Sequence, residues 1–192
     1  MSEYLYESAR IQCSKNKLGE GGFGVVYRGL FDGKKVAIKV VNVRDDEQHF
    51  IRKRDFLRDF PHRNILMLMH FEEIPQVKRY FSINDLNLII LVRYFVFELC
   101  AASLQEWANG RYTGTIPSEM AGLHHMASGL AFVHSKRHVH CNIYPRNILI
   151  SSNGDRLIIS DFGLVKKVHE SGSFSAFMEW KNGSLLNAFE MI

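Results

Sequence analysis

Residues 19–26 read GEGGFGVV, and residues 36–39 read VAIK. The first stretch fits the pattern G-x-G-x-x-G-x-V, in which glycines let the backbone approach a phosphate closely with its N–H groups free to donate. In a dinucleotide-binding fold this pattern is followed directly by a helix. Here strand-forming residues surround the turn signal Asp32-Gly33, so the stretch predicts an antiparallel hairpin and excludes the dinucleotide fold.

The glycine stretch alone allows two interpretations, a phosphate-binding loop and a glycine-rich turn without a ligand. Lys39 favours the first. A lone lysine in a strand is usually solvated, but Lys39 follows the apolar Ala37 and Ile38, so its side chain is expected to point inward. A lysine in this motif can reach the α- and β-phosphates of a nucleotide.

Two later segments complete a set of four motifs. Residues 140–147 read HCNIYPRN, in register with the catalytic-loop pattern H-R-D-L-x-x-x-N. Residues 161–163 read DFG, and the aspartate of that motif can hold Mg²⁺ over nucleotide phosphates. With the four motifs in this order, the chain resembles the eukaryotic protein kinases from the glycine loop onward.

Three longer stretches narrow the resemblance: VYRGLFD at 26–32, ELCAASLQE at 98–106 and ISDFGLVKK at 159–167. They resemble the inositol-requiring kinase–endoribonucleases of the unfolded protein response, with the related ribonuclease L as a second match. The resemblance implies a homodimer or a covalently attached endoribonuclease domain as partner. For a longer parent protein it implies a location at the cytosolic face of the endoplasmic reticulum membrane.

The order of the predicted elements, strands first and helix later, predicts an α+β fold with two lobes. By resemblance, residues 1–100 form a five-stranded antiparallel N-lobe with one helix, at 46–60, and end in the hinge. Residues 101–192 form a partial, mainly helical C-lobe that stops at the activation segment. Its main helix is expected at 118–137 with Ser118 as the N-cap, and its apolar face should be partly uncovered.

Composition places the chain among ordinary globular proteins. Apolar residues make up 46% and the formal charge is +4, which excludes a disordered chain and permits an anionic ligand. No direct nucleic-acid site is predicted. Three cysteines, an odd and sparse set, predict a reducing, cytoplasmic compartment. The longest apolar run, residues 86–97, is too short and too interrupted for a membrane segment, which needs about 20 apolar residues.

The resemblance implies a site for ATP or ADP with Mg²⁺. Backbone groups of the glycine loop and the Lys39 side chain would contact phosphates, and the Phe97 side chain would be the gatekeeper beside the hinge. The loop glycines are Gly19, Gly21 and Gly24. The resemblance further implies that Val26, Ala37 and Leu149 surround the adenine and that the backbone of Glu98 and Cys100 forms hydrogen bonds with it. Asn147 and Asp161 would bind Mg²⁺.

The residues that would transfer the phosphoryl group are replaced. Asn142 stands at the position of the catalytic aspartate, and an amide has no useful basicity. Tyr144 and Cys141 stand where related loops carry a lysine and an arginine. The sequence therefore predicts a pseudokinase that works as a nucleotide switch, with a weakly active serine/threonine kinase and a nucleotide-free scaffold as alternatives. His140 is expected to be architectural.

The acidic partner of Lys39 in the N-lobe helix is not apparent. Counted without gaps, its position falls on Arg52 or Lys53, and Asp55 is the nearest acid. His134 and His138 are four residues apart, but no H-E-x-x-H motif and no C-x-x-C pair occurs. The only metal expected is therefore Mg²⁺ held through a nucleotide.

Residues 77–93 have no counterpart in the resembled family, which joins these two strands by a short turn. The segment is either a loop insertion or untranslated gene sequence, and residues 88–92 would compete with residues 94–97 for one strand position. The chain ends just after Ala188-Phe189-Glu190, where kinases have A-P-E, which predicts a fragment of a longer protein. Ser171, Ser173 and Ser175 are expected to form a flexible loop rather than a phosphorylation switch.

Overall fold

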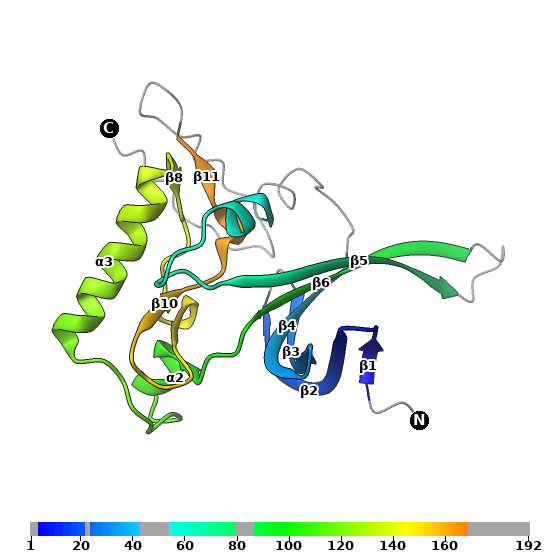
Figure 1. Cartoon of the computed structure of the whole chain (residues 1–192), viewed down its shortest axis with the longest axis horizontal. Coiled ribbons are helices and arrows are strands. Elements are labelled where there is room, and N and C mark those ends of the chain that lie inside the picture. The colour runs from blue at the N-terminus through cyan, green and yellow to red at the C-terminus, as the bar shows by residue number, and fades with distance from the viewer. Residues whose placement is uncertain (1–3, 22–23, 43–53, 80–86, 169–192) are drawn as a thin grey trace, which may run out of the picture.

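The computed structural model describes residues 4–21, 24–42, 54–79 and 87–168 (Figure 1). Its N-terminal part is an antiparallel sheet with the strand order β1-β2-β3-β4-β6-β5. The strands are β1 (Tyr4–Glu7), β2 (Ile11–Gly21), β3 (Gly24–Phe31), β4 (Lys34–Asn42), β5 (Leu68–Arg79) and β6 (Asn87–Glu98). The turn between β3 and β4 has positive φ at both Asp32 and Gly33, as the predicted tight hairpin requires.

The sheet has six strands where the sequence analysis expects five. The additional strand, β1, pairs with β2 at one edge of the sheet. The ring of Tyr6 in β1 nevertheless stacks on Tyr94 at 4.2 Å, and its hydroxyl donates to Glu72 at 2.8 Å. Glu72 lies in β5 at the other edge, so the sheet is curled and its two edges approach each other. A four-residue strand held by such distant contacts has no strong local pattern in the sequence.

Residues 77–79 and 87–93 lengthen the pairing of β5 with β6 and form no competing strand. β5 and β6 stay paired from Leu68↔Phe97 out to Arg79↔Asn87, whereas β4 pairs with β6 only as far as Asn42↔Val92. Figure 1 shows this hairpin reaching beyond the rest of the sheet. The expectation that residues 88–92 compete with residues 94–97 is wrong, because both segments lie in the single strand β6.

The C-terminal part is built around α3 (Glu119–Ser135), which stands beside two small sheets (Figure 1). Ser118 caps α3 by accepting from the Ala121 N–H, which confirms the predicted cap. Residues 54–59 are helical, within the predicted helix 46–60. The other elements are β7 (Ala102–Ser103), α2 (Leu104–Ala108), β8 (His138–Val139), β9 (Ile148–Ile150), β10 (Leu157–Ile159), β11 (Lys166–Lys167) and the 3₁₀ turns η1 (Pro145–Asn147) and η2 (Phe162–Leu164).

Two apolar clusters hold these elements together. One lies against the sheet and contains Ile11, Val36, Ile38 and Val96. The larger one joins both lobes, because it combines Phe95 and Phe97 of β6 with Phe56 of the N-lobe helix and with Phe162, Val133 and the buried residues of β9 and β10. The segments that carry the candidate site therefore rest on one shared core.

The outer side of α3 carries exposed apolar side chains, as expected. Met120 and Leu123 have 76% and 66% of their surface accessible. No helix within the described residues is both long enough and apolar enough to cross a bilayer.

Candidate nucleotide-binding site

The glycine loop lies between β2 and β3, where Gly21 and Gly24 are register partners. A Cβ atom added to Gly19 or Gly21 would meet nothing within 4 Å, so the space above these residues is open. Gly24 differs, because it has a φ of +123° and an added Cβ would lie 2.4 Å from the carbonyl oxygen of Val40. The close approach of β4 therefore requires glycine at this position, whether or not a ligand binds. Residues 22–23, at the tip, lie outside the described residues.

Lys39 points inward, as predicted. It lies in β4 opposite Val26 of β3 and Phe95 of β6. Its Nζ is 3.3 Å from Oδ1 of Asp161, with side-chain exposures of 14% and 22%. This ion pair brings together the lysine of the second motif and the aspartate of the fourth.

Asn142 joins the same group through a contact that sequence reasoning did not anticipate. Its Nδ2 donates to Oδ2 of Asp161 at 3.0 Å, so both oxygens of this carboxylate accept a hydrogen bond. The Nδ2 of Asn147 in turn donates to the main-chain oxygen of Asn142 at 2.9 Å. We call Lys39, Asn142, Asn147 and Asp161 the polar cluster. Its residues come from β4, from the loop after β8, from η1 and from the loop before η2.

His140 contacts the polar cluster through the backbone of Asn142, and Phe162 packs against His140. His140 is buried; its Nδ1 accepts from the backbone N–H of Asn142 at 3.2 Å, and its Nε2 lies 3.0 Å from the carbonyl oxygen of Ser160. Both ring nitrogens are therefore used in backbone hydrogen bonds, which suits an architectural residue. The imidazole meets the ring of Phe162 edge-on at 4.5 Å, and Phe162 stacks on Phe56 at 5.1 Å.

Ala37 and Leu149, two of the three residues expected around a base, lie where the two lobes meet. Ala37 is the register partner of Phe97, whose side chain is buried. Ala37, Cys100 and Leu149 pack against the larger apolar cluster. Burial raises the pKa of the Cys100 thiol to about 12, so it is neutral at physiological pH. The N–H of Glu98 reaches the carbonyl of Met67 at 3.4 Å.

The hinge also carries an ion pair between Glu98 and Arg156. Arg156 Nη2 is 2.8 Å from Oε2 of Glu98, while Oε1 accepts from the Met67 N–H at 3.2 Å. The Arg156 side chain is only 27% exposed and the Glu98 side chain only 20%. Because Arg156 directly precedes β10, this pair ties the end of β6 to the C-terminal lobe.

Replacing Arg156 with methionine is expected to lower the free energy of unfolding by about 1–2 kcal/mol, because Glu98 then loses a partly buried charged partner. Arg58→Met is the matched control: Arg58 pairs with Asp59 at 2.7 Å on the surface, and its loss should be unmeasurable in the same urea titration. Equal losses in the two variants would show that the hinge pair is no stronger than a surface pair.

Other predicted residues lie outside the polar cluster. Asp55 pairs with Arg54 at 2.9 Å and with Arg58 at 3.4 Å. Tyr144 is 47% exposed, and Cys141 is exposed with a φ of +59°. Neighbouring protein atoms still displace part of the water around its sulfur, which raises the pKa of the Cys141 thiol. Arg52, Lys53, the three serines and residues 188–190 lie outside the described residues.

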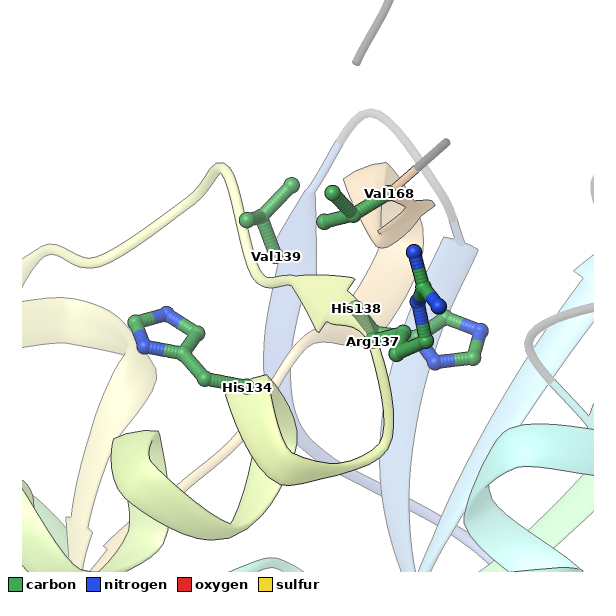
Figure 2. Close-up of a pocket in the computed structure, with 5 residues that line it drawn as sticks. All are labelled: His134, Arg137, His138, Val139 and Val168. Atoms are coloured by element: carbon green, nitrogen blue, oxygen red, sulfur yellow. The ribbon is translucent and has the colours of Figure 1, made fainter. Parts of the chain in front are cut away.

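Within the described ranges, no group of three or more acidic, histidine or cysteine side chains could hold a metal ion alone. His134 and His138 line a hollow of about 190 Å³ together with Arg137, Val139 and Val168. Figure 2 shows the two imidazoles on different sides of this hollow, which shares no residue with the polar cluster.

Comparisons with known proteins agree on one family. The family model described as "Protein kinase domain" matches residues 13–182. The chain is 35% identical over 158 residues to "Serine/threonine-protein kinase/endoribonuclease ire-1" of Caenorhabditis elegans, covering 79% of this chain and 15% of that protein. It is 35% identical over 161 residues to the human "Serine/threonine-protein kinase/endoribonuclease IRE2", covering 80% and 16%. It is 30% identical over 167 residues to mouse "Cyclin-dependent kinase 15", covering 84% and 35%.

Proposed function

The chain belongs to the protein kinase domain family, and from that premise we propose that it binds ATP or ADP and acts as a nucleotide-dependent switch with little or no phosphoryl transfer. One observation carries the loss of transfer. The position of the catalytic base holds Asn142, whose amide donates to Asp161 at 3.0 Å. An amide cannot take up the proton of an acceptor hydroxyl, and losing general-base help typically costs about 10²–10⁴-fold in rate.

Nucleotide binding is supported by the residues that remain. Lys39 is directed inward and is held by Asp161, so its ammonium group is ready to contact the α- and β-phosphates. The open space over Gly19 and Gly21 leaves room for phosphates against the backbone. We assign adenine contacts to Val26, Ala37 and Leu149, and base hydrogen bonds to the backbone of Glu98 and Cys100.

A Mg²⁺ ion would be held by Asp161 and Asn147 together with the nucleotide. One carboxylate, one amide oxygen and phosphate oxygens are a donor set that Mg²⁺ accepts, since this ion usually binds through few carboxylates plus substrate phosphates. When bound, it would neutralise phosphate charge. The chain's own part is to keep the Asp161 carboxylate partly buried and in one orientation.

The chain spans about 15% of the length of the kinase/endoribonucleases it matches. We propose that nucleotide binding favours a back-to-back dimer and thereby activates an attached endoribonuclease domain. We further propose a cytoplasmic location for this kinase-like chain, which fits its free cysteines Cys13, Cys100 and Cys141.

Two measurements on the purified chain test this function. A thermal-shift titration is expected to raise the melting temperature with ATP or ADP, because a ligand that binds only the folded state stabilises it. Incubation with labelled ATP and Mg²⁺ is expected to give no phosphorylated protein. Lys39→Ala should abolish the thermal shift, whereas Lys35→Ala, at an exposed position of the same strand, should retain it.

The alternatives give different results in the same experiments. Robust autophosphorylation that Lys39→Ala removes would establish a weakly active serine/threonine kinase in which Asn142 only orients the hydroxyl. Absence of a thermal shift with every nucleotide tested would establish a nucleotide-free interaction scaffold.

A further inference from the structure

We propose that Asn142 makes nucleotide binding in this pocket largely independent of Mg²⁺. The inference rests on the proposed nucleotide function and adds the cation requirement of that site. Its basis is the hydrogen bond from Asn142 Nδ2 to Asp161 Oδ2 at 3.0 Å, which engages the carboxylate expected to bind the metal.

Asn142 is held so that its amide stays on Asp161. Its backbone N–H donates to Nδ1 of His140, and its main-chain oxygen accepts from Nδ2 of Asn147. The Asn142 side chain is also buried, at 6% exposure. The two contacts fix the main chain of Asn142, and burial leaves its side chain little room to turn away from Asp161, so a cation has to compete with this donor.

The second oxygen of the carboxylate is engaged as well. Lys39 Nζ lies 3.3 Å from Oδ1 of Asp161. A divalent cation that binds Asp161 must therefore share an oxygen with the lysine ammonium or with the amide. When the phosphates of a nucleotide attract Lys39, Oδ1 loses the lysine contact, and Oδ2 keeps its amide partner.

The net charge of the polar cluster also favours nucleotide binding without Mg²⁺. Lys39 and Asp161 carry opposite charges, and Asn142 and Asn147 are neutral, so the four side chains of the polar cluster sum to zero. An aspartate in place of Asn142 would add a negative charge within hydrogen-bond distance of Asp161. It would attract Mg²⁺ and repel a bare nucleotide, because like charges at this separation interact strongly in a partly buried site. The amide removes both effects.

Calorimetric titration of the whole chain with ATP, once in EDTA and once in excess Mg²⁺, tests the inference. For the natural sequence, the two dissociation constants are expected to agree within about threefold. For Asn142→Asp, binding in EDTA should weaken by roughly tenfold or more and recover in Mg²⁺. Asn142→Ala, which removes the donor without adding charge, should fall between them in its Mg²⁺ dependence. Melting curves of each variant verify that it is folded.

The outcomes separate this inference from the function on which it rests. Binding by the natural sequence that is tenfold or more tighter in Mg²⁺ than in EDTA overturns the inference and leaves the nucleotide switch intact. That comparison needs no variant, so it remains decisive if Asn142→Asp does not fold. A folded Asn142→Asp protein with the cation dependence of the natural sequence also overturns it. The absence of binding heat in both conditions refutes the nucleotide function itself.

Discussion

Replacing Phe162 with alanine is expected to lower the free energy of unfolding by about 3–5 kcal/mol, the usual range for removing a buried phenylalanine ring. Phe162 is 1% exposed and lies in the apolar cluster that joins the two lobes. Its ring centroid lies 5.1 Å from that of Phe56 in the N-lobe helix and 4.5 Å from that of His140. The substitution therefore leaves a cavity between segments that are distant in the sequence and that carry the polar cluster.

Urea denaturation of the full chain measures this loss, with Met120→Ala as the control. Met120 is also apolar but 76% exposed, so its truncation should change the unfolding free energy by no more than about 0.5 kcal/mol. A Phe162→Ala variant that loses no more stability than Met120→Ala would contradict the shared core between the lobes.

Replacing Gly29 with alanine is expected to destabilise the N-terminal sheet by about 1–3 kcal/mol through overpacking. Gly29 is buried in β3, and an added Cβ would lie 2.2 Å from Cδ1 of Ile38 and 2.6 Å from the backbone oxygen of Gln12. The Ile38 methyl group can rotate away, but the carbonyl belongs to the neighbouring strand β2. Relief of that contact requires the β2–β3 pairing to shift.

Gly21→Ala is the matched control for this prediction. An added Cβ at Gly21 meets nothing within 4 Å, so the unfolding free energy should change by less than about 0.5 kcal/mol in the same denaturation experiment. If the two variants are equally stable, the tight β2–β3 packing at Gly29 is wrong.

The structure confirms most local patterns in the sequence. The hairpin turn at Asp32-Gly33 has the positive φ angles that its residues favour, and Ser118 caps α3. The inward orientation of Lys39 also follows from its apolar neighbours. Each of these features depends on residues that are close in the chain, so a short stretch contains enough information to predict it.

Features that depend on distant partners were missed or only partly understood. β1 stays in place partly because Tyr6 bonds to Glu72, 66 residues away. Gly24 fits the phosphate-binding pattern, yet its contact with the Val40 carbonyl gives it a steric role in the sheet. From the sequence, Asn142 is only an amide at the position of a base, and its donation to Asp161 depends on two loops that meet only in the folded chain.

The order of the four motifs is sufficient to assign the family and to show that Asn142 stands where the catalytic-loop pattern has an aspartate, because residue type at a motif position is a property of the chain alone. The motifs do not show which groups form hydrogen bonds with the Asp161 carboxylate. Lys39 and Asp161 are 122 residues apart, and they meet because the apolar cluster between the lobes brings β4 against the loop before η2. That encounter depends on the packing of many distant side chains, which no local pattern encodes.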